Sequence, residues 1–270
     1  MMRALYTAAS GMRAQQTNVD NISNNIANVN TTAFKSQKTE FKSLLYQTIQ
    51  TRTTSANGEE KPIGAQVGLG TRVASNTTSY TQGALLEDES KSAFAIEGNG
   101  FFQVRGADGT TYYTRNGNFN WSIGPTGTTL TNTDGYPVLD SNGNTIVLPN
   151  NVNSEKAVVT TDGQVGYYNN AGAYVSMNRT IGLSQFNNPA GLEKAGSNLL
   201  RATNASGAAL NEATNANLTR SKIHQSYLEG SNVQADEMVN LIVAQRAYQL
   251  NSKAITTSDD MLEQANNLKR

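Results

Sequence analysis

The sequence predicts an α+β fold: discontinuous terminal helices that form a coiled coil, and an antiparallel all-β domain inserted between them. Heptad spacing of apolar residues near both chain ends predicts the helices. Asp-Gly and Asn-Gly dipeptides between short β-rich runs predict the β domain. Because the domain is inserted between the helices, both helices leave from it and can pair as an antiparallel hairpin.

The N-terminal helix is predicted from a heptad that starts at Leu5. Its seam positions are Leu5, Ala8, Met12, Gln15, Val19, Ile22, Ile26 and Val29. The pattern predicts a helix of roughly 25 to 28 residues, on the order of 40 Å long at about 1.5 Å per residue.

A second stripe on the same helix consists of asparagines and lies about 110° from the apolar seam. Its members are Asn18, Asn21, Asn25 and Asn28. A solvated face would carry Glu and Lys, yet residues 1–30 hold only Arg3, Arg13 and Asp20 as charged residues. Uncharged amides suit a face packed on other helices. Since the chain offers one other long helix, we expect other copies to supply the remaining neighbours.

The C-terminal helix is predicted to begin after Ser231 and Asn232, which are favourable N-cap residues, with Gln234 placed for a capping box. Its apolar seam positions are Leu241, Tyr248, Ile255 and Leu262, separated by the polar seam residues Gln245, Ser252 and Asp259. The predicted contact surface between copies comprises Leu5, Met12, Val19, Ile22, Ile26, Asn21, Asn25, Asn28, Leu241, Tyr248, Ile255 and Leu262.

The middle of the chain carries the hairpin signals. These are Asp108-Gly109, Asn116-Gly117, Asp134-Gly135, Asn142-Gly143 and Asp162-Gly163. We predict three parts: paired helices in residues 1–34 and 230–270, an extended connecting region in 35–84 and 216–229, and the antiparallel β domain in 85–215.

The composition excludes several function classes. The chain has no cysteine, one histidine, and 21 basic against 21 acidic residues. Disulfides and thiolate chemistry are therefore excluded, and the charge balance gives no support to nucleic-acid binding. No run is long and apolar enough for a membrane span or a secretory signal, so we expect a cytosolic protein or one that leaves by another route.

Three possible chemical sites have simpler interpretations. The stretch from Asp140 to Asn144 spaces oxygens like a calcium loop, but its glycine is misplaced for one, which favours a hairpin turn. The stretch from Gly98 to Gln103 begins like a dinucleotide loop, yet it runs into a strand. A serine-type catalytic triad would have to use His224, but the sequence contains no nucleophile elbow that would present a serine. We therefore expect no cofactor, metal, small-molecule substrate or catalytic residue.

Together these residues resemble the bacterial flagellar rod and hook protein family. "NNIANVNTTAFK" at 24–35 is similar to the family's signature, commonly A-N-x-x-T-x-G-[FY]-K, and "GNGFFQV", "YTRNGNF" and residues 231–270 extend the likeness. The matching signature residues are Asn24, Asn25, Ala27, Asn28, Thr31, Phe34 and Lys35. Where the family commonly has glycine, this chain has Ala33, which is strained if the turn requires positive φ.

The resemblance implies a non-enzymatic structural subunit of a helical tube, with paired termini as the inner layer and the β domain as the outer layer. It implies unfolded export through the flagellar type III channel to the basal body in the cell envelope. Implied partners are further copies, proximal rod proteins, the hook protein or hook–rod junction, and the surrounding rings. The segment from Tyr46 to Gly64 resembles a stretch typical of distal rod proteins, so we expect the distal rod.

The sequence also allows other interpretations. Within the family, the alternatives are a proximal rod subunit and a hook subunit. From a different class, it can be a surface β-rich adhesin with coiled-coil termini, which would expose aromatic clusters on its β domain. A hydrolase would need a titratable pair in a cleft, and the sequence has no such motif.

Overall fold

The chain folds as two compact units. The computed structural model describes residues 2–50, 65–124, 127–149, 152–169 and 172–268. One unit, here the helical unit, is drawn from residues 1–27, 37–78 and 234–270, and the other, here the β unit, from residues 28–36 and 79–233. Every strand pair among the described residues is antiparallel. The predicted α+β class with antiparallel strands is therefore confirmed.

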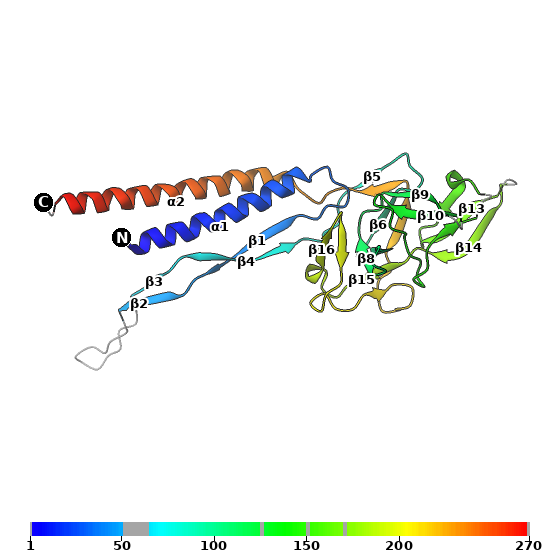
Figure 1. Cartoon of the computed structure of the whole chain (residues 1–270), viewed down its shortest axis with the longest axis horizontal. Helices are drawn as coiled ribbons and strands as arrows, with labels where there is room; N and C mark the ends of the chain where they lie inside the picture. Colours follow the sequence, from blue (N-terminus) through cyan, green and yellow to red (C-terminus); the bar gives the residue numbers. More distant parts are fainter. Residues whose placement is uncertain (1, 51–64, 125–126, 150–151, 170–171, 269–270) are drawn as a thin grey trace, which may run out of the picture. The chain divides into compact units, whose positions relative to one another are not determined.

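The helical unit consists of a helix pair and a two-stranded ribbon (Figure 1). Its elements are α1 (Met2–Ala27), β1 (Gln37–Ser43), β2 (Tyr46–Gln50), β3 (Ala65–Gly68), β4 (Thr71–Thr78) and α2 (Asp236–Asn267). The helices lie side by side and antiparallel, so the chain ends are at the same end of the pair. Strand β1 pairs with β4 and β2 with β3. Hydrogen bonds from the Leu44 N–H to Gly70 and from the Leu69 N–H to Leu45 join the two pairings into one ribbon.

Two predicted helix boundaries were wrong. Helix α2 begins at Asp236 with Ala235 as its N-cap residue, and no side chain caps it. Asn232 cannot cap the helix because its amide bonds to the Ser79 carbonyl and to the Ser36 N–H within the β unit. Helix α1 ends at Ala27, so the predicted seam residue Val29 lies beyond the helix and is exposed.

The β unit is built from short strands in several small sheets. Its strands are β5 (Leu85–Glu87), β6 (Phe94–Glu97), β7 (Phe101–Arg105), β8 (Thr111–Thr114), β9 (Phe119–Gly124), β10 (Gly127–Asn132), β11 (Val147–Leu148), β12 (Ala157–Val159), β13 (Gln164–Tyr168), β14 (Tyr174–Thr180), β15 (Leu183–Gln185), β16 (Glu193–Gly196), β17 (Leu199–Arg201), β18 (Leu210–Asn211), β19 (Lys222–Gln225) and β20 (Tyr227–Glu229). The largest sheet has the order β16-β17-β8-β7-β15-β18. Short 3-10 helices cover Ser154–Lys156 and Pro189–Gly191.

Strand β7 divides the core of the β unit into two apolar clusters. Phe102 and Val104 point into the larger cluster, and Phe101 points into the smaller one with Tyr113 and Phe186. Successive side chains of a strand point to opposite faces, so the run "FFQV" serves both clusters. This strand is buried on both faces, which explains why its sequence lacks polar alternation.

The predicted hairpin turns follow the expected backbone chemistry at four of the five dipeptides. Gly109, Gly135, Gly143 and Gly163 all have φ between 78° and 83°, a region that glycine enters without steric cost. Gly117 is different, since it is needed for space. A Cβ there would collide with the Phe94 carbonyl oxygen.

Candidate assembly surface

The two helices meet along a seam of small and apolar side chains. Ala8, Ala14 and Ile22 of α1 and Ala244 of α2 are buried. The helices approach closely at Gly11, where an added Cβ would lie 2.9 Å from Asn251 Nδ2. The predicted seam residues Leu5, Met12, Val19, Ile26, Leu241, Ile255 and Leu262 are half-buried, and Tyr248 is 41% exposed.

Two of the three polar positions predicted for the α2 seam lie one residue away from it. Gln245 and Asp259 are exposed, whereas their neighbours Ala244 and Ser258 are buried and half-buried; the third predicted residue, Ser252, is half-buried, as is its neighbour Asn251. The 3-4 alternation that follows from Leu241 leads to Ala244. The sequence analysis did not identify Ala244, Asn251 and Ser258 as seam positions, because none of them carries a large apolar side chain.

Gln15 is the polar residue of the α1 seam. Its Oε1 is buried and has no hydrogen-bond partner among the described residues. A buried acceptor without a partner costs about 1–3 kcal/mol. The seam therefore carries a local instability in the single chain.

The asparagine stripe of α1 lies against strand β1 of the same chain. Asn25 is 1% exposed, and its amide donates to the Gln37 carbonyl (2.8 Å) and accepts from the Gln37 N–H (2.9 Å). Asn21 Nδ2 donates to Thr39 Oγ1 at 2.6 Å. Four helical residues rise about 6 Å and two strand residues about 6.6 Å, so an i, i+4 pair on the helix matches an i, i+2 pair on the strand.

This contact changes the interpretation of the amide face. We expected its partners to come from other copies because one further helix could not cover it. Strand β1, which the sequence did not predict, covers it at Asn21 and Asn25. The amides at these two positions therefore hold a strand to a helix within one chain.

The signature residues after α1 form a tight turn in the β unit. Asn28 Oδ1 accepts from the Thr31 hydroxyl (3.1 Å), and its carbonyl accepts from the Thr31 N–H. Ala27 ends the helix, and Asn24 lies on its exposed side. Phe34 lies 5.7 Å from Lys194 Nζ, measured to its ring centroid.

Ala33 has a φ of 56°, in the left-handed region. The strain expected from alanine at this position is therefore present, at a cost of roughly 1–2 kcal/mol. The conformation directs the buried Ala33 N–H to the Glu229 carbonyl oxygen at 2.7 Å. The turn thus holds the segment after α1 to the end of β20.

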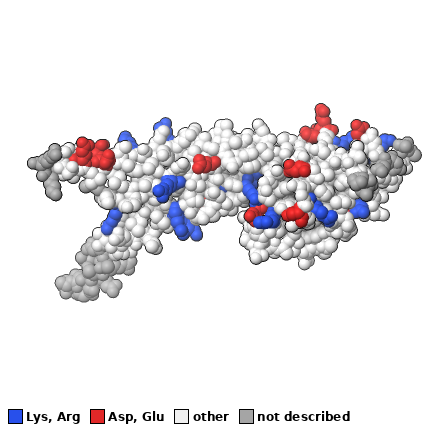
Figure 2. Space-filling model, in the orientation of Figure 1, with Lys and Arg blue, Asp and Glu red and all other residues white. Residues whose placement is uncertain are grey.

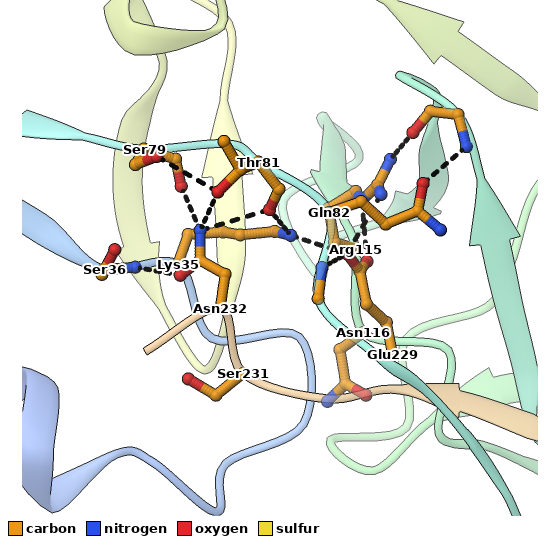
Figure 3. A network of polar contacts seen from close by, with 12 residues as sticks. Lys35, Ser36, Ser79, Thr81, Gln82, Arg115, Asn116, Glu229, Ser231 and Asn232 are labelled. Carbon is orange, nitrogen blue, oxygen red and sulfur yellow. Dashed lines mark hydrogen bonds and ion pairs between the residues drawn. The ribbon is translucent and has the colours of Figure 1, made fainter. Parts of the chain in front are cut away.

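Lys35 belongs to a buried charge cluster centred on Glu229 (Figure 3). Lys35 Nζ lies 2.7 Å from Glu229 Oε1 and donates to the Thr81 carbonyl at 2.8 Å. Arg115 Nε donates to Glu229 Oε2 at 2.9 Å and its Nη1 to the Gly98 and Gly100 carbonyls. Sequence reasoning missed Glu229 and Arg115, because no spacing links residues so far apart in the chain.

The electrostatics of this cluster favour an ionised Glu229. Burial alone would raise the pKa of Glu229, but hydrogen bonds and charges from Arg115 and Lys35 outweigh it and lower the pKa below its ordinary value. Burial lowers the pKa of Lys35, which Glu229 opposes and the Arg115 charge reinforces. Two buried cations share one carboxylate, so its removal would leave uncompensated buried charge.

A second apolar stripe on α2 faces away from α1. Val239, Val243, Leu250 and Met261 of α2 and its C-cap residue Leu268 are each more than half exposed. At about 100° per residue they lie roughly 220° around the helix from the seam residue Ile255. An amphipathic helix of a monomeric protein buries its apolar stripe, so a second, uncovered stripe marks a contact surface.

The three weaker candidates from the sequence have structural roles. Asp140 accepts the N–H groups of Asn142 and Asn144 in a hairpin turn, and its Oδ2 pairs with Arg179 at 2.8 Å. Gly98 has a φ of 129° in the turn that leads into β7. His224 Nε2 lies 2.8 Å from Glu97 Oε2 on the surface, on neighbouring strands.

The described ranges contain neither a membrane-spanning helix nor a cluster of metal-ligating side chains. No described helix combines the length and apolar character needed to cross a membrane. Residues 2–50, 65–124, 127–149, 152–169 and 172–268 contain no group of three or more histidines or carboxylates arranged to hold a metal ion.

Three family models match the chain in separate places. "Flagella basal body rod protein" matches residues 5–35, "Flagellar hook protein FlgE/F/G D1 domain" matches residues 95–167, and "Flagellar basal body rod FlgEFG protein C-terminal" matches residues 224–268. These ranges hold the amide-rich helix and its turn, the strands around β7, and α2.

Curated relatives match over the full length. The flagellar basal-body rod protein FlgG of Borreliella burgdorferi is 43% identical and that of Bacillus subtilis 39%, and each alignment covers 100% of both chains. The flagellar hook-basal body complex protein FlhP of Bacillus subtilis is 31% identical, again over 100% of both chains. Of the two Bacillus subtilis proteins, the rod protein is the more similar. The chain therefore belongs to the FlgG family of flagellar basal-body rod proteins.

Proposed function

We propose that this protein is a structural subunit of the flagellar distal rod that assembles with its own copies into a helical tube. It is a non-enzymatic component of the basal body. In our proposal the paired helices form a coiled-coil inner layer and the β unit forms the outer layer, so that torque passes to the hook through many weak contacts.

The second apolar stripe on α2 is the observation that carries this proposal. One stripe of α2 already packs on α1, so the exposed stripe needs a partner outside the described chain. Burial of one such side chain contributes about 1.5–3 kcal/mol. Because a polymer repeats the contact at every subunit, the stripe favours self-assembly over a single pairing.

The proposal is tested by changing this stripe in the full chain. Val243 is 62% exposed, so Val243→Asp should leave the monomer folded and greatly raise the concentration needed for polymer, because assembly would bury the charge. Ile123→Asp in β9 is the matched control, since Ile123 is 89% exposed. Polymer is measured by sedimentation and electron microscopy. Normal assembly of Val243→Asp would contradict the role of the stripe.

The seam residue Ile26 gives a second test. Ile26→Asp should prevent assembly and leave the melting of the β unit unchanged, because Ile26 belongs to the helical unit. The predicted segment from Tyr46 to Gly64 is described only up to Gln50. We propose that it stiffens the rod, and that deletion of residues 48–60 yields folded subunits whose filaments are no longer straight.

The remaining partners follow from the family. We propose contacts with proximal rod proteins at one end, with the hook protein or hook–rod junction at the other, and with surrounding rings where an outer membrane exists. Delivery through the flagellar export apparatus is part of the same proposal. The adhesin, hydrolase and other axial positions are not favoured by the relatives.

A further inference from the structure

Two arginines flank a groove in the helical unit between α1 and β4. The groove has a volume of about 430 Å³. Small side chains, Ala9, Ser10 and Ala14, leave the space open, and Arg13 and Arg72 line its sides. Both arginines are exposed. The groove is therefore an accessible basic site of limited size.

Charge pairing is unequal between the two units. The ion pairs among the described residues are Lys35–Glu229, Arg115–Glu229, Arg179–Asp140, Arg201–Glu193 and His224–Glu97, all in the β unit. The described part of the helical unit carries Arg3, Arg13, Lys38, Lys42, Arg72, Arg246 and Lys253 against Asp20, Glu40, Asp236, Glu237, Asp259, Asp260 and Glu263. None of these charges forms an ion pair within the described chain. Charges of both signs are thus available to a neighbour.

Acidic residues gather at the C-terminal end of α2 (Figure 2). They are Asp259, Asp260 and Glu263, of which Asp259 and Glu263 repel each other at i, i+4 spacing. An arrangement that is unfavourable in the single chain becomes favourable when a cation is placed beside it.

We infer that the acidic end of α2 in one copy docks in the arginine groove of the next copy. This inference rests on the proposed self-assembly and adds its specific contact. The two patches are different and opposite in charge, so the contact is head-to-tail. Head-to-tail contacts that do not close generate helical filaments, whereas a patch that pairs with itself generates dimers.

The positions of the two patches also define an offset between copies. Gly11 lies against Asn251, which fixes the relative level of the helices in one chain. Arg13 is two residues beyond Gly11, and Asp260 is nine residues from Asn251 in the opposite direction along the pair. At about 1.5 Å per residue, the levels differ by roughly 16 Å. Neighbouring copies joined in this way are displaced along the helix pair by about that distance.

Charge reversal and charge exchange in the full chain test the contact. One variant carries Arg13→Glu with Arg72→Glu, and a second carries Asp259→Lys with Asp260→Lys. Each alone should raise the critical concentration for polymer at least about tenfold, because like charges would face each other. Mixing the two variants, or combining all four changes in one chain, should restore assembly. Wild-type assembly should weaken as salt is raised.

Matched controls separate this contact from general charge effects. Lys253→Glu reverses an exposed charge of the helical unit outside both patches and should leave the critical concentration within about twofold of wild type. Circular dichroism of each variant checks that the helices are intact. An equal effect of Lys253→Glu, or no restoration in the mixture and the four-fold variant, would overturn the pairing.

The outcome for wild type distinguishes the two proposals. If wild type assembles and both reversal variants assemble equally well, the groove contact is wrong and the proposed function stands. If wild type forms no polymer at any concentration reached, the proposed function fails, and the inference that depends on it fails too.

Discussion

Replacement of Asn25 by leucine tests whether the amide stripe holds β1 to α1. Asn25 is buried, and both of its short hydrogen bonds go to the backbone of Gln37. Leucine has the same number and branching of side-chain heavy atoms as asparagine, and it keeps the helix. The change therefore removes the hydrogen bonds while keeping the branched outline of the side chain, and it leaves the Gln37 N–H and carbonyl without these partners.

The magnitude follows from the two peptide groups. A buried donor or acceptor that loses its partner costs about 1–3 kcal/mol. At about 2 kcal/mol for each of the two groups, less roughly 1 kcal/mol for the added apolar burial of leucine, the net cost is about 3 kcal/mol. Asn21→Leu removes one hydrogen bond to the Thr39 hydroxyl, so it should cost only about 1 kcal/mol.

Amide hydrogen exchange measures this loss of stability at single residues. The Gln37 amide should exchange on the order of 100-fold faster in Asn25→Leu, because each 1.4 kcal/mol corresponds to a factor of ten. The effect of Asn21→Leu on the same amide should be several-fold smaller. The Val104 amide, in the core of the β unit, should be unchanged in both. Unaltered exchange at Gln37 in Asn25→Leu would refute the reasoning.

Three further predictions concern individual residues. Gln15→Met should stabilise the helix pair by about 1 kcal/mol, since it replaces an unpartnered buried acceptor, and a lower helix melting temperature by far-UV circular dichroism would contradict this. Ala33→Gly should change the unfolding free energy of the β unit by less than about 1 kcal/mol, because relief of strain offsets lost burial and added chain entropy, whereas Ala33→Val should cost about 2–3 kcal/mol in urea titrations. Glu229→Gln should cost about 3–5 kcal/mol at neutral pH. The pKa of Glu229 is lowered by folding, so its contribution is present above about pH 4.5 and is lost as pH falls through the folded pKa. Urea titrations across this range should show the difference between wild type and Glu229→Gln shrinking at low pH, and a constant difference would count against the ionised carboxylate.

The helices and turns could be predicted because their signals are local. The heptads place α1 and α2 correctly to within a few residues, and Asx-Gly dipeptides mark four turns with positive φ. The predicted start of α2 was wrong because the residue that gives the local capping signal forms hydrogen bonds to distant parts of the chain. Asn232 is a favourable cap residue, yet its amide is occupied by Ser79 and Ser36.

The ribbon of β1 to β4 could not be predicted in the same way. The sequence "QKTEFKS" of β1 lacks apolar alternation, and most of its side chains are exposed. The strand is held by backbone pairing with β4 and by the amides of α1, and neither produces a hydrophobic period. The Glu229 cluster was missed for a related reason, because Lys35, Arg115 and Glu229 meet only through the tertiary fold.

The strain at Ala33 is explained by what the turn connects. The chain enters the β unit through residues 28–36 and leaves it through residues 229–233. These segments are joined by the bonds from the Ala33 N–H to Glu229 (2.7 Å), from the Asn232 N–H to Phe34 (3.3 Å) and from the Ser36 N–H to the Asn232 side chain (2.7 Å). Backbone strain persists only where surrounding contacts over-determine the conformation, and here three hydrogen bonds and a buried ion cluster do so. Because the segments that lead to both helices share these bonds, a load on either segment is resisted by both of them in parallel.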